Sequence, residues 1–173
     1  MVPEAAQPPL EVEISDTQGH LRVDPEALAR LARGVLTGEG IGRASISIAL
    51  VDEATIRAMN RRHLDHDWPT DVLSFRLSEP DDPTLSGALI VSAELAAATA
   101  REAGVDPWAE LALYVVHGLL HLCGYDDTTD EEVERIRRRE DELLARGGLT
   151  NTFPLVRPDG AVEGERESAR WSD

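Results

Sequence analysis

The segment that follows Asp106-Pro107 is the most apolar stretch of the chain, and it limits the possible folds most strongly. An aspartate followed by a proline is typical of a helix N-cap and first helical position. The apolar residues behind it fall on every side of a helix: Leu111, Leu113, Val115, Val116, Leu119, Leu120 and Leu122. A helix that is apolar all round has to be enclosed by other elements. The sequence therefore predicts a buried central helix around which a domain packs.

Strands and further helices are predicted on both sides of this helix. Alternating or short apolar runs indicate strands at 10–14, 46–51, 72–75 and 87–91. Helices are expected at 25–38, 52–63, 94–102 and, behind a capping box at 129–132, up to 146. Because strands and helices do not alternate regularly, we predict an α+β fold with a small mixed, roughly four-stranded sheet packed against helices.

One domain is predicted over residues 10–147. Residues 1–9 contain three prolines and are expected to form a flexible N-terminal arm. Residues 148–173 are polar and are expected to form a flexible C-terminal tail. A chain of 173 residues is long enough to bury a core without disulfide bonds.

Composition restricts the class of protein. The chain holds 17 basic residues, all arginine, against 33 acidic residues, a formal charge of −16. Such acidity argues against a protein that coats nucleic acid through a broad basic surface. The single cysteine, the lack of a membrane-length apolar run and the lack of a secretory signal at the N-terminus predict a cytoplasmic enzyme or binding module.

A metal site is predicted at the end of the central helix. His117 and His121 are four residues apart, so both imidazoles project from one helical face and can reach one ion. Gly124 can end the helix and turn the chain back, which brings Asp127 to the same ion as a third ligand. Asp126 competes with Asp127 for that place, or orients a ligand. Three protein ligands leave a position for water, as in catalytic zinc sites.

Two residues close to the histidines argue against a zinc peptidase site and against a cysteine ligand. Zinc peptidases of the His-Glu-x-x-His type need a glutamate after the first histidine, and this chain has Gly118 there. Cys123 is expected to be a packing residue, because on the helix it points away from the two histidines.

A second group of functional candidates lies between Arg57 and Arg76, where the sequence has four arginines and two histidines. Guanidinium groups pair well with phosphate oxygens. Arg61, Arg62, His66 and Arg76 are therefore candidates for binding an RNA backbone, although a solvated helix end is the simpler alternative. The run Arg135-Ile136-Arg137-Arg138-Arg139 is interpreted as surface ion pairing with glutamates on its own helix. Trp68 and Trp108 are expected to pack.

Two motifs resemble those of the YbeY family of bacterial rRNA maturation endoribonucleases. They are Pro-Thr-Asp-Val-Leu-Ser-Phe at 69–75 and His-Gly-Leu-Leu-His-Leu-Cys-Gly-Tyr-Asp at 117–126, and the likeness extends from about Leu10 to Ala145. The resemblance implies a metal-dependent hydrolase, usually described with one zinc ion, that cleaves single-stranded RNA. It also implies work at the 3′ end of 16S rRNA and in ribosome quality control, with the ribosome and its proteins as partners.

Two positions depart from the family pattern. The family motif normally ends in a third histidine, where this chain has Asp127, and it usually carries an arginine where this chain has Leu64. A carboxylate is a competent zinc ligand, although it makes the ion a weaker Lewis acid. Arg61 or Arg62 is a candidate to replace the missing charge.

The leading hypothesis is metal-assisted cleavage of RNA phosphodiester bonds. His117, His121 and Asp127 would hold the ion, with Asp126, Ser74 and Asp71 as candidate supporting residues for a metal-bound water. Either a metal-bound hydroxide or the ribose 2′-OH can be the nucleophile. The alternative is a non-catalytic ribosome-assembly factor in which zinc only holds the helix to the following turn.

Overall fold

The computed structural model describes residues 9–64 and 70–151 of the chain. Its elements follow the predicted order: β1 (Leu10–Asp16), α1 (Pro25–Gly38), β2 (Ala44–Val51), α2 (Glu53–Leu64), β3 (Val72–Arg76), β4 (Leu85–Ser92), α3 (Ala93–Ala103), α4 (Pro107–Leu122) and α5 (Asp130–Arg146). Strand β4 begins two residues before the predicted strand, so Leu85 and Ser86 belong to the sheet and not to a loop. Most of the predicted arm and tail lies outside the described residues.

The four strands form one mixed sheet in the order β1-β2-β4-β3. Strand β2 lies parallel to β1 and to β4, whereas β3 pairs antiparallel with β4 and forms an edge. Helix α1 connects the parallel strands β1 and β2, which no short hairpin could join. The predicted α+β domain with a mixed four-stranded sheet is confirmed.

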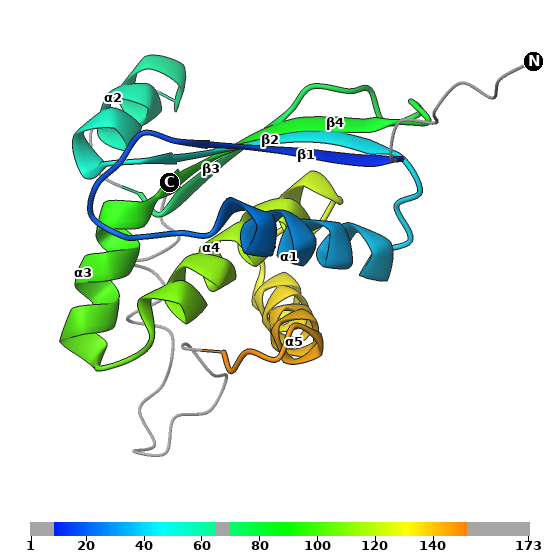
Figure 1. The fold of residues 1–173 in the computed structure, drawn as a ribbon. Coiled ribbons are helices and arrows are strands. Elements are labelled where there is room, and N and C mark those ends of the chain that lie inside the picture. Colours follow the sequence, from blue (N-terminus) through cyan, green and yellow to red (C-terminus); the bar gives the residue numbers. More distant parts are fainter. Residues whose placement is uncertain (1–8, 65–69, 152–173) are drawn as a thin grey trace, which may run out of the picture.

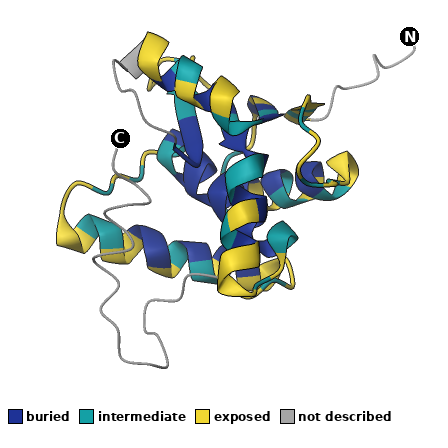
Figure 2. Ribbon diagram, turned by 90° about the vertical axis from the view of Figure 1, so that its left-hand side faces the viewer, coloured by how far each residue is buried: buried dark blue, intermediate teal, exposed yellow. Residues whose placement is uncertain are grey.

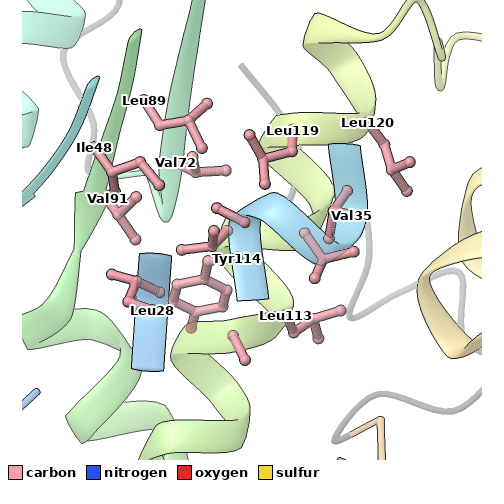
Figure 3. Close-up of a cluster of buried hydrophobic side chains, with 14 of the residues drawn as sticks. Leu28, Val35, Ile48, Val72, Leu89, Val91, Leu113, Tyr114, Leu119 and Leu120 are labelled. Carbon is pink, nitrogen blue, oxygen red and sulfur yellow. The ribbon is translucent and has the colours of Figure 1, made fainter. Parts of the chain in front are cut away.

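Helices α1, α4 and α5 lie on one side of the sheet, and α2 lies on the other (Figure 1). Helix α4 is enclosed by the sheet, α1, α3 and α5, and residues 109–120 of it are all buried (Figure 2). Tyr114 and Leu119 of this helix pack among Leu28, Ile48 and Leu89 (Figure 3). The predicted central helix is therefore confirmed. In the described ranges, no helix is both long and apolar enough to cross a membrane.

Local sequence signals place the ends of the helices around the core. The Asp106 carboxylate accepts a hydrogen bond from the Trp108 N–H at 3.0 Å, which fixes the start of α4. Thr129 and Glu132 form a reciprocal capping box at the start of α5. Both helices that frame the candidate site thus begin where the sequence predicts.

Gly118 sets how closely α4 approaches the sheet. A Cβ atom at this position would lie 2.9 Å from Val72 Cγ2 and 3.0 Å from Leu89 Cδ2, inside van der Waals contact. The Ser74 hydroxyl also donates a hydrogen bond to the Gly118 carbonyl oxygen at 3.1 Å. The glutamate that a zinc peptidase carries after its first histidine would therefore collide with β3 and β4.

Substitution of Gly118 tests this contact. We expect Gly118→Ala to lower the free energy of unfolding by about 1–3 kcal/mol, because the added methyl overpacks a closed interface. Gly34→Ala is the matched control: Gly34 is also helical, yet its Cβ would meet nothing within 4 Å. In urea denaturation, Gly34→Ala should leave the free energy of unfolding unchanged or raise it by up to about 1 kcal/mol. Equal stabilities for the two variants would contradict the close approach.

Candidate metal centre

The backbone at the end of α4 brings Asp127 back toward the two histidines. Gly124 has a φ of 104°, in the region that favours glycine, and lets the chain reverse directly after the helix. The Tyr125 N–H donates to the Leu120 carbonyl oxygen at 3.0 Å and holds this turn against the helix. Asp127 therefore follows a turn that the sequence fixes locally.

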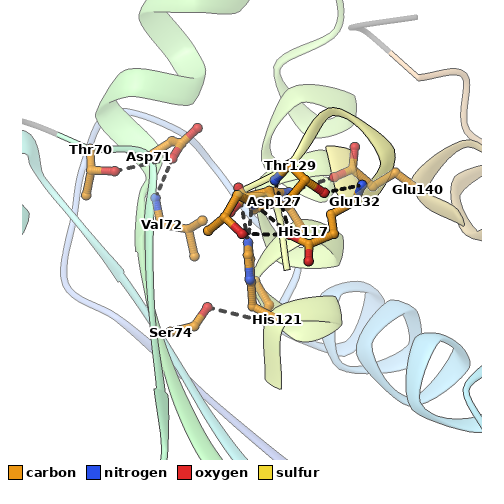
Figure 4. A network of polar contacts seen from close by, with 12 residues as sticks. Thr70, Asp71, Val72, Ser74, His117, His121, Asp127, Thr129, Glu132 and Glu140 are labelled. Atoms are coloured by element: carbon orange, nitrogen blue, oxygen red, sulfur yellow. Dashed lines mark hydrogen bonds and ion pairs between the residues drawn. The ribbon is translucent and has the colours of Figure 1, made fainter. Parts of the chain in front are cut away.

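His117, His121 and Asp127 come together as one cluster (Figure 4). The two Nε2 atoms are 2.9 Å apart, and Asp127 Oδ2 lies 3.5 Å from Nε2 of His121 and 3.7 Å from Nε2 of His117. Ligand atoms around a tetrahedral zinc ion with bonds of about 2.0–2.1 Å are separated by about 3.3 Å. The cluster could therefore hold a metal ion after small adjustments, and its two imidazoles and carboxylate are a donor set that suits zinc.

The cluster is buried on one side and accessible on the other. The His117 side chain is 4% exposed, whereas the side chains of His121 and Asp127 are 25% and 23% exposed. Three protein ligands leave a further coordination position. The exposed side would give water or a substrate oxygen access to that position.

Electrostatics in the cluster favour positive charge between the ligands. Burial lowers the pKa of His121, but the hydrogen bond and charge of Asp127 outweigh burial and raise it above its ordinary value. The hydrogen bond from His121 lowers the pKa of Asp127, against the opposing effect of burial. The Asp127 carboxylate is therefore the group that attracts positive charge to this cluster.

Glu140 of α5 is a member of the site that the sequence argument missed. Its Oε1 atom lies 2.7 Å from His117 Nδ1, and both side chains are 4% exposed. The signal was present in the sequence: Glu140 occupies the buried face of α5 together with Ile136, Leu143 and Leu144. An acidic residue on an apolar helical face needs a buried partner.

The three predicted supporting residues differ in their surroundings. Ser74 is partly exposed and donates to Gly118 of the helix that carries the two histidines. Asp71 is 1% exposed, and its carboxylate accepts from the Val72 N–H at 2.9 Å at the start of β3. Asp126 is exposed, and it lies outside the group of converging ligand atoms found among the described residues. The geometry thus favours Asp127 over Asp126 as the third ligand.

The predicted RNA-binding residues fall on two elements. Arg61 and Arg62 are exposed near the end of α2, and Arg76 is exposed at the end of β3. The charge of Arg76 acts on Cys123 at the C-terminal end of α4, which places Arg76 near the end of the helix that carries the cluster. His66 and Trp68 lie outside the described residues.

The interpretation of the α5 arginines as surface pairs is only partly right. Arg138 pairs with Glu134 at 2.8 Å, as the helical spacing predicts. Arg137, however, is 3% exposed, so its inclusion in a surface run was wrong. Arg139 pairs with Glu142 on its own helix and also binds Glu39 at the end of α1. Its side chain therefore joins two helices, which a pattern within one helix cannot reveal.

Two residues expected to pack do so. Trp108 and Cys123 are partly buried and lie against the main hydrophobic core. Burial raises the pKa of the Cys123 thiol to about 11, with Glu39 adding to the rise and Arg76 opposing it. Cys123 thus behaves as a small apolar residue and not as an activated thiolate.

An α+β domain with a His-His-Asp cluster of this geometry falls in the class of proteins that could hold a metal ion at the end of a buried helix. The family model of endoribonuclease YbeY matches residues 13–148. Curated relatives named endoribonuclease YbeY include one from Carboxydothermus hydrogenoformans, 40% identical over 79% of this chain and 97% of the relative. Another, from Pelotomaculum thermopropionicum, is 38% identical over 82% of this chain and 99% of the relative.

A solved structure has a similar fold. The solution structure of TM1509 from Thermotoga maritima superposes with a TM-score of 0.53 at 28% identity, over 79% of this chain and 90% of that one. The chain therefore belongs to the endoribonuclease YbeY family, and it is an endoribonuclease.

The reactivity of Cys123 tests the packing at the end of α4. Because the thiolate is the reactive form and burial raises the pKa to about 11, alkylation at pH 8 should be on the order of 100-fold slower than for an unfolded thiol. The folded protein should react about tenfold faster with each pH unit up to about 10, whereas the chain in urea should level off near pH 9. A folded-state rate that levels off near pH 9 would contradict this environment.

Proposed function

We propose that this protein is a zinc-dependent, single-strand-specific endoribonuclease that matures the 3′ end of 16S rRNA and serves ribosome quality control in the cytoplasm. The observation that carries the proposal is the convergence of His117, His121 and Asp127 at the end of the helix that bears the family motif. Two imidazoles and one carboxylate favour zinc as the bound ion, because magnesium prefers sites in which all ligands are oxygen atoms.

Each residue of the centre has a defined part in this proposal. His117 and His121 would bind the ion through Nε2, and Asp127 through Oδ2. A bound zinc ion would supply Lewis-acid stabilisation of the phosphoryl oxygens and lower the pKa of a coordinated water. The hydroxyl of Ser74 donates to the Gly118 carbonyl, so its oxygen can meet RNA as an acceptor, for example from a ribose 2′-OH.

Exposed arginines on α2 and at the end of β3 would hold the RNA backbone. Arg61, Arg62 and Arg76 are exposed and carry guanidinium groups that match phosphate oxygens. The whole chain has a formal charge of −16, which repels RNA at long range. We therefore propose that the isolated protein binds RNA weakly and that the ribosome and its proteins supply the placement.

Removal of one ligand tests the proposed activity. We expect His121→Ala to slow cleavage of a single-stranded rRNA fragment by about 100-fold or more, because a metal ion contributes several kcal/mol to transition-state stabilisation. His20→Ala is the control, since His20 is exposed and lies 3.3 Å from Glu94 instead of at the cluster. Equal cleavage by the original chain and both variants would indicate a contaminating nuclease. Zinc-dependent stability without cleavage by the original chain would favour the assembly-factor alternative.

Metal content tests which aspartate is the third ligand. We expect purified Asp127→Ala to contain well under one zinc ion per chain, because two imidazoles alone hold zinc weakly. Asp126→Ala is the matched control, as Asp126 is adjacent but exposed, and it should retain the zinc content of the original chain. Elemental analysis after dialysis gives the answer. Loss of zinc from Asp126→Ala with retention by Asp127→Ala would reverse the assignment.

A further inference from the structure

Glu140 occupies a position where an unpartnered carboxylate would be costly. It lies on the face of α5 that packs against the core, between the apolar residues Ile136 and Leu143, and is 3% exposed. Burial of a charge is tolerated when a partner and hydrogen bonds compensate it. A leucine would avoid this cost, so the glutamate must make an interaction that an apolar side chain cannot make.

One partner of Glu140 is the ring nitrogen of His117 that faces away from the metal cluster. Glu140 Oε1 lies 2.7 Å from Nδ1, a short distance typical of charge-assisted hydrogen bonds. An ionised Glu140 can only accept a hydrogen bond, and Nδ1 of His117 would then carry the proton and donate it. Nε2 of the neutral ring is then a lone-pair donor that points at His121 and Asp127.

The neighbouring contact is consistent with the same tautomer. His117 Nε2 lies 2.9 Å from His121 Nε2, so one of the two nitrogens must donate. With the His117 proton committed to Glu140, Nε2 of His117 accepts and His121 donates. A metal ion would take the place of that shared proton, and His117 would not need to change its tautomer.

We infer that Glu140 is a positioning residue of the metal centre, which fixes the tautomer and ring orientation of His117 and increases its basicity toward the ion. This inference rests on the proposed function, because it assigns Glu140 a part in the same metal site. Carboxylates that orient a metal-binding histidine commonly contribute 10–100-fold to metal affinity.

Metal affinity and ring tautomer test this role in the full-length chain. Glu140→Gln keeps the size and a carbonyl acceptor but removes the charge, and should weaken zinc binding about 10-fold in chelator competition. Glu140→Ala removes the acceptor and should weaken binding by up to about 100-fold. In the metal-free chain, ¹H–¹⁵N correlation spectra should show His117 protonated at Nδ1 in the original chain and in Glu140→Gln, and a tautomer mixture in Glu140→Ala.

Two controls separate positioning from a purely structural contribution. Glu134→Gln removes an exposed carboxylate from the same helix and should leave zinc affinity unchanged. Ile136→Val removes a buried methylene next to Glu140, costs about 0.5–1.5 kcal/mol of stability and should also keep zinc affinity. A loss of affinity in Glu140→Gln that Ile136→Val does not share supports positioning, whereas an equal loss in both overturns it.

The remaining outcomes are also decisive. A change of less than about threefold in zinc affinity for Glu140→Gln, with His117 still protonated at Nδ1 in Glu140→Ala, would overturn the inference. Failure of the original chain to bind zinc would count against the proposed function instead. In that case the tautomer of His117 in the metal-free chain still tests Glu140 by itself.

Discussion

The close packing of α4 against the sheet is the constraint on which the rest of the structure depends. At Gly118 the helix approaches β3 and β4 so closely that an added Cβ atom would lie 2.9 Å from Val72 and 3.0 Å from Leu89, and this contact limits how far the helix can shift or rotate against the sheet. His117 and His121 lie on either side of this glycine in the sequence, so the same contact helps to set where the helix places their side chains. The positions of the candidate metal ligands therefore depend on how α4 packs against the sheet.

The centre combines a local part with a distant part. Helix α4, the Gly124 turn and Asp127 form a continuous segment that defines the three candidate ligands. Glu140 comes from the next helix and meets His117 from the side opposite the ion position. The continuous segment supplies the three candidate ligand atoms. Glu140 would determine how strongly one of them, His117 Nε2, binds a metal ion. A site built in this way can change its metal affinity through α5 without changing any ligand.

Sequence patterns predicted the local features well, because helix caps, apolar periodicity and the i, i+4 spacing act over a few residues. The central helix, the capping box at Thr129 and the convergence of His117, His121 and Asp127 are of this kind. Contacts between elements were missed. The pairing of Arg139 with Glu39 and the contact of Glu140 with His117 join residues on different helices, and one sequence carries no record of which helices meet. The burial of Arg137 was missed for the same reason.

The position of the three candidate ligands within residues 117–127 has a consequence for folding. A loop of about ten residues closes in about 10–100 ns, far faster than the pairing of distant strands. The ligand segment can therefore meet a metal ion during synthesis, before the sheet is complete and before Glu140 has left the ribosome. Early binding of this kind would make the ion a participant in folding, with α5 docking afterwards onto a helix end that the metal has already organised.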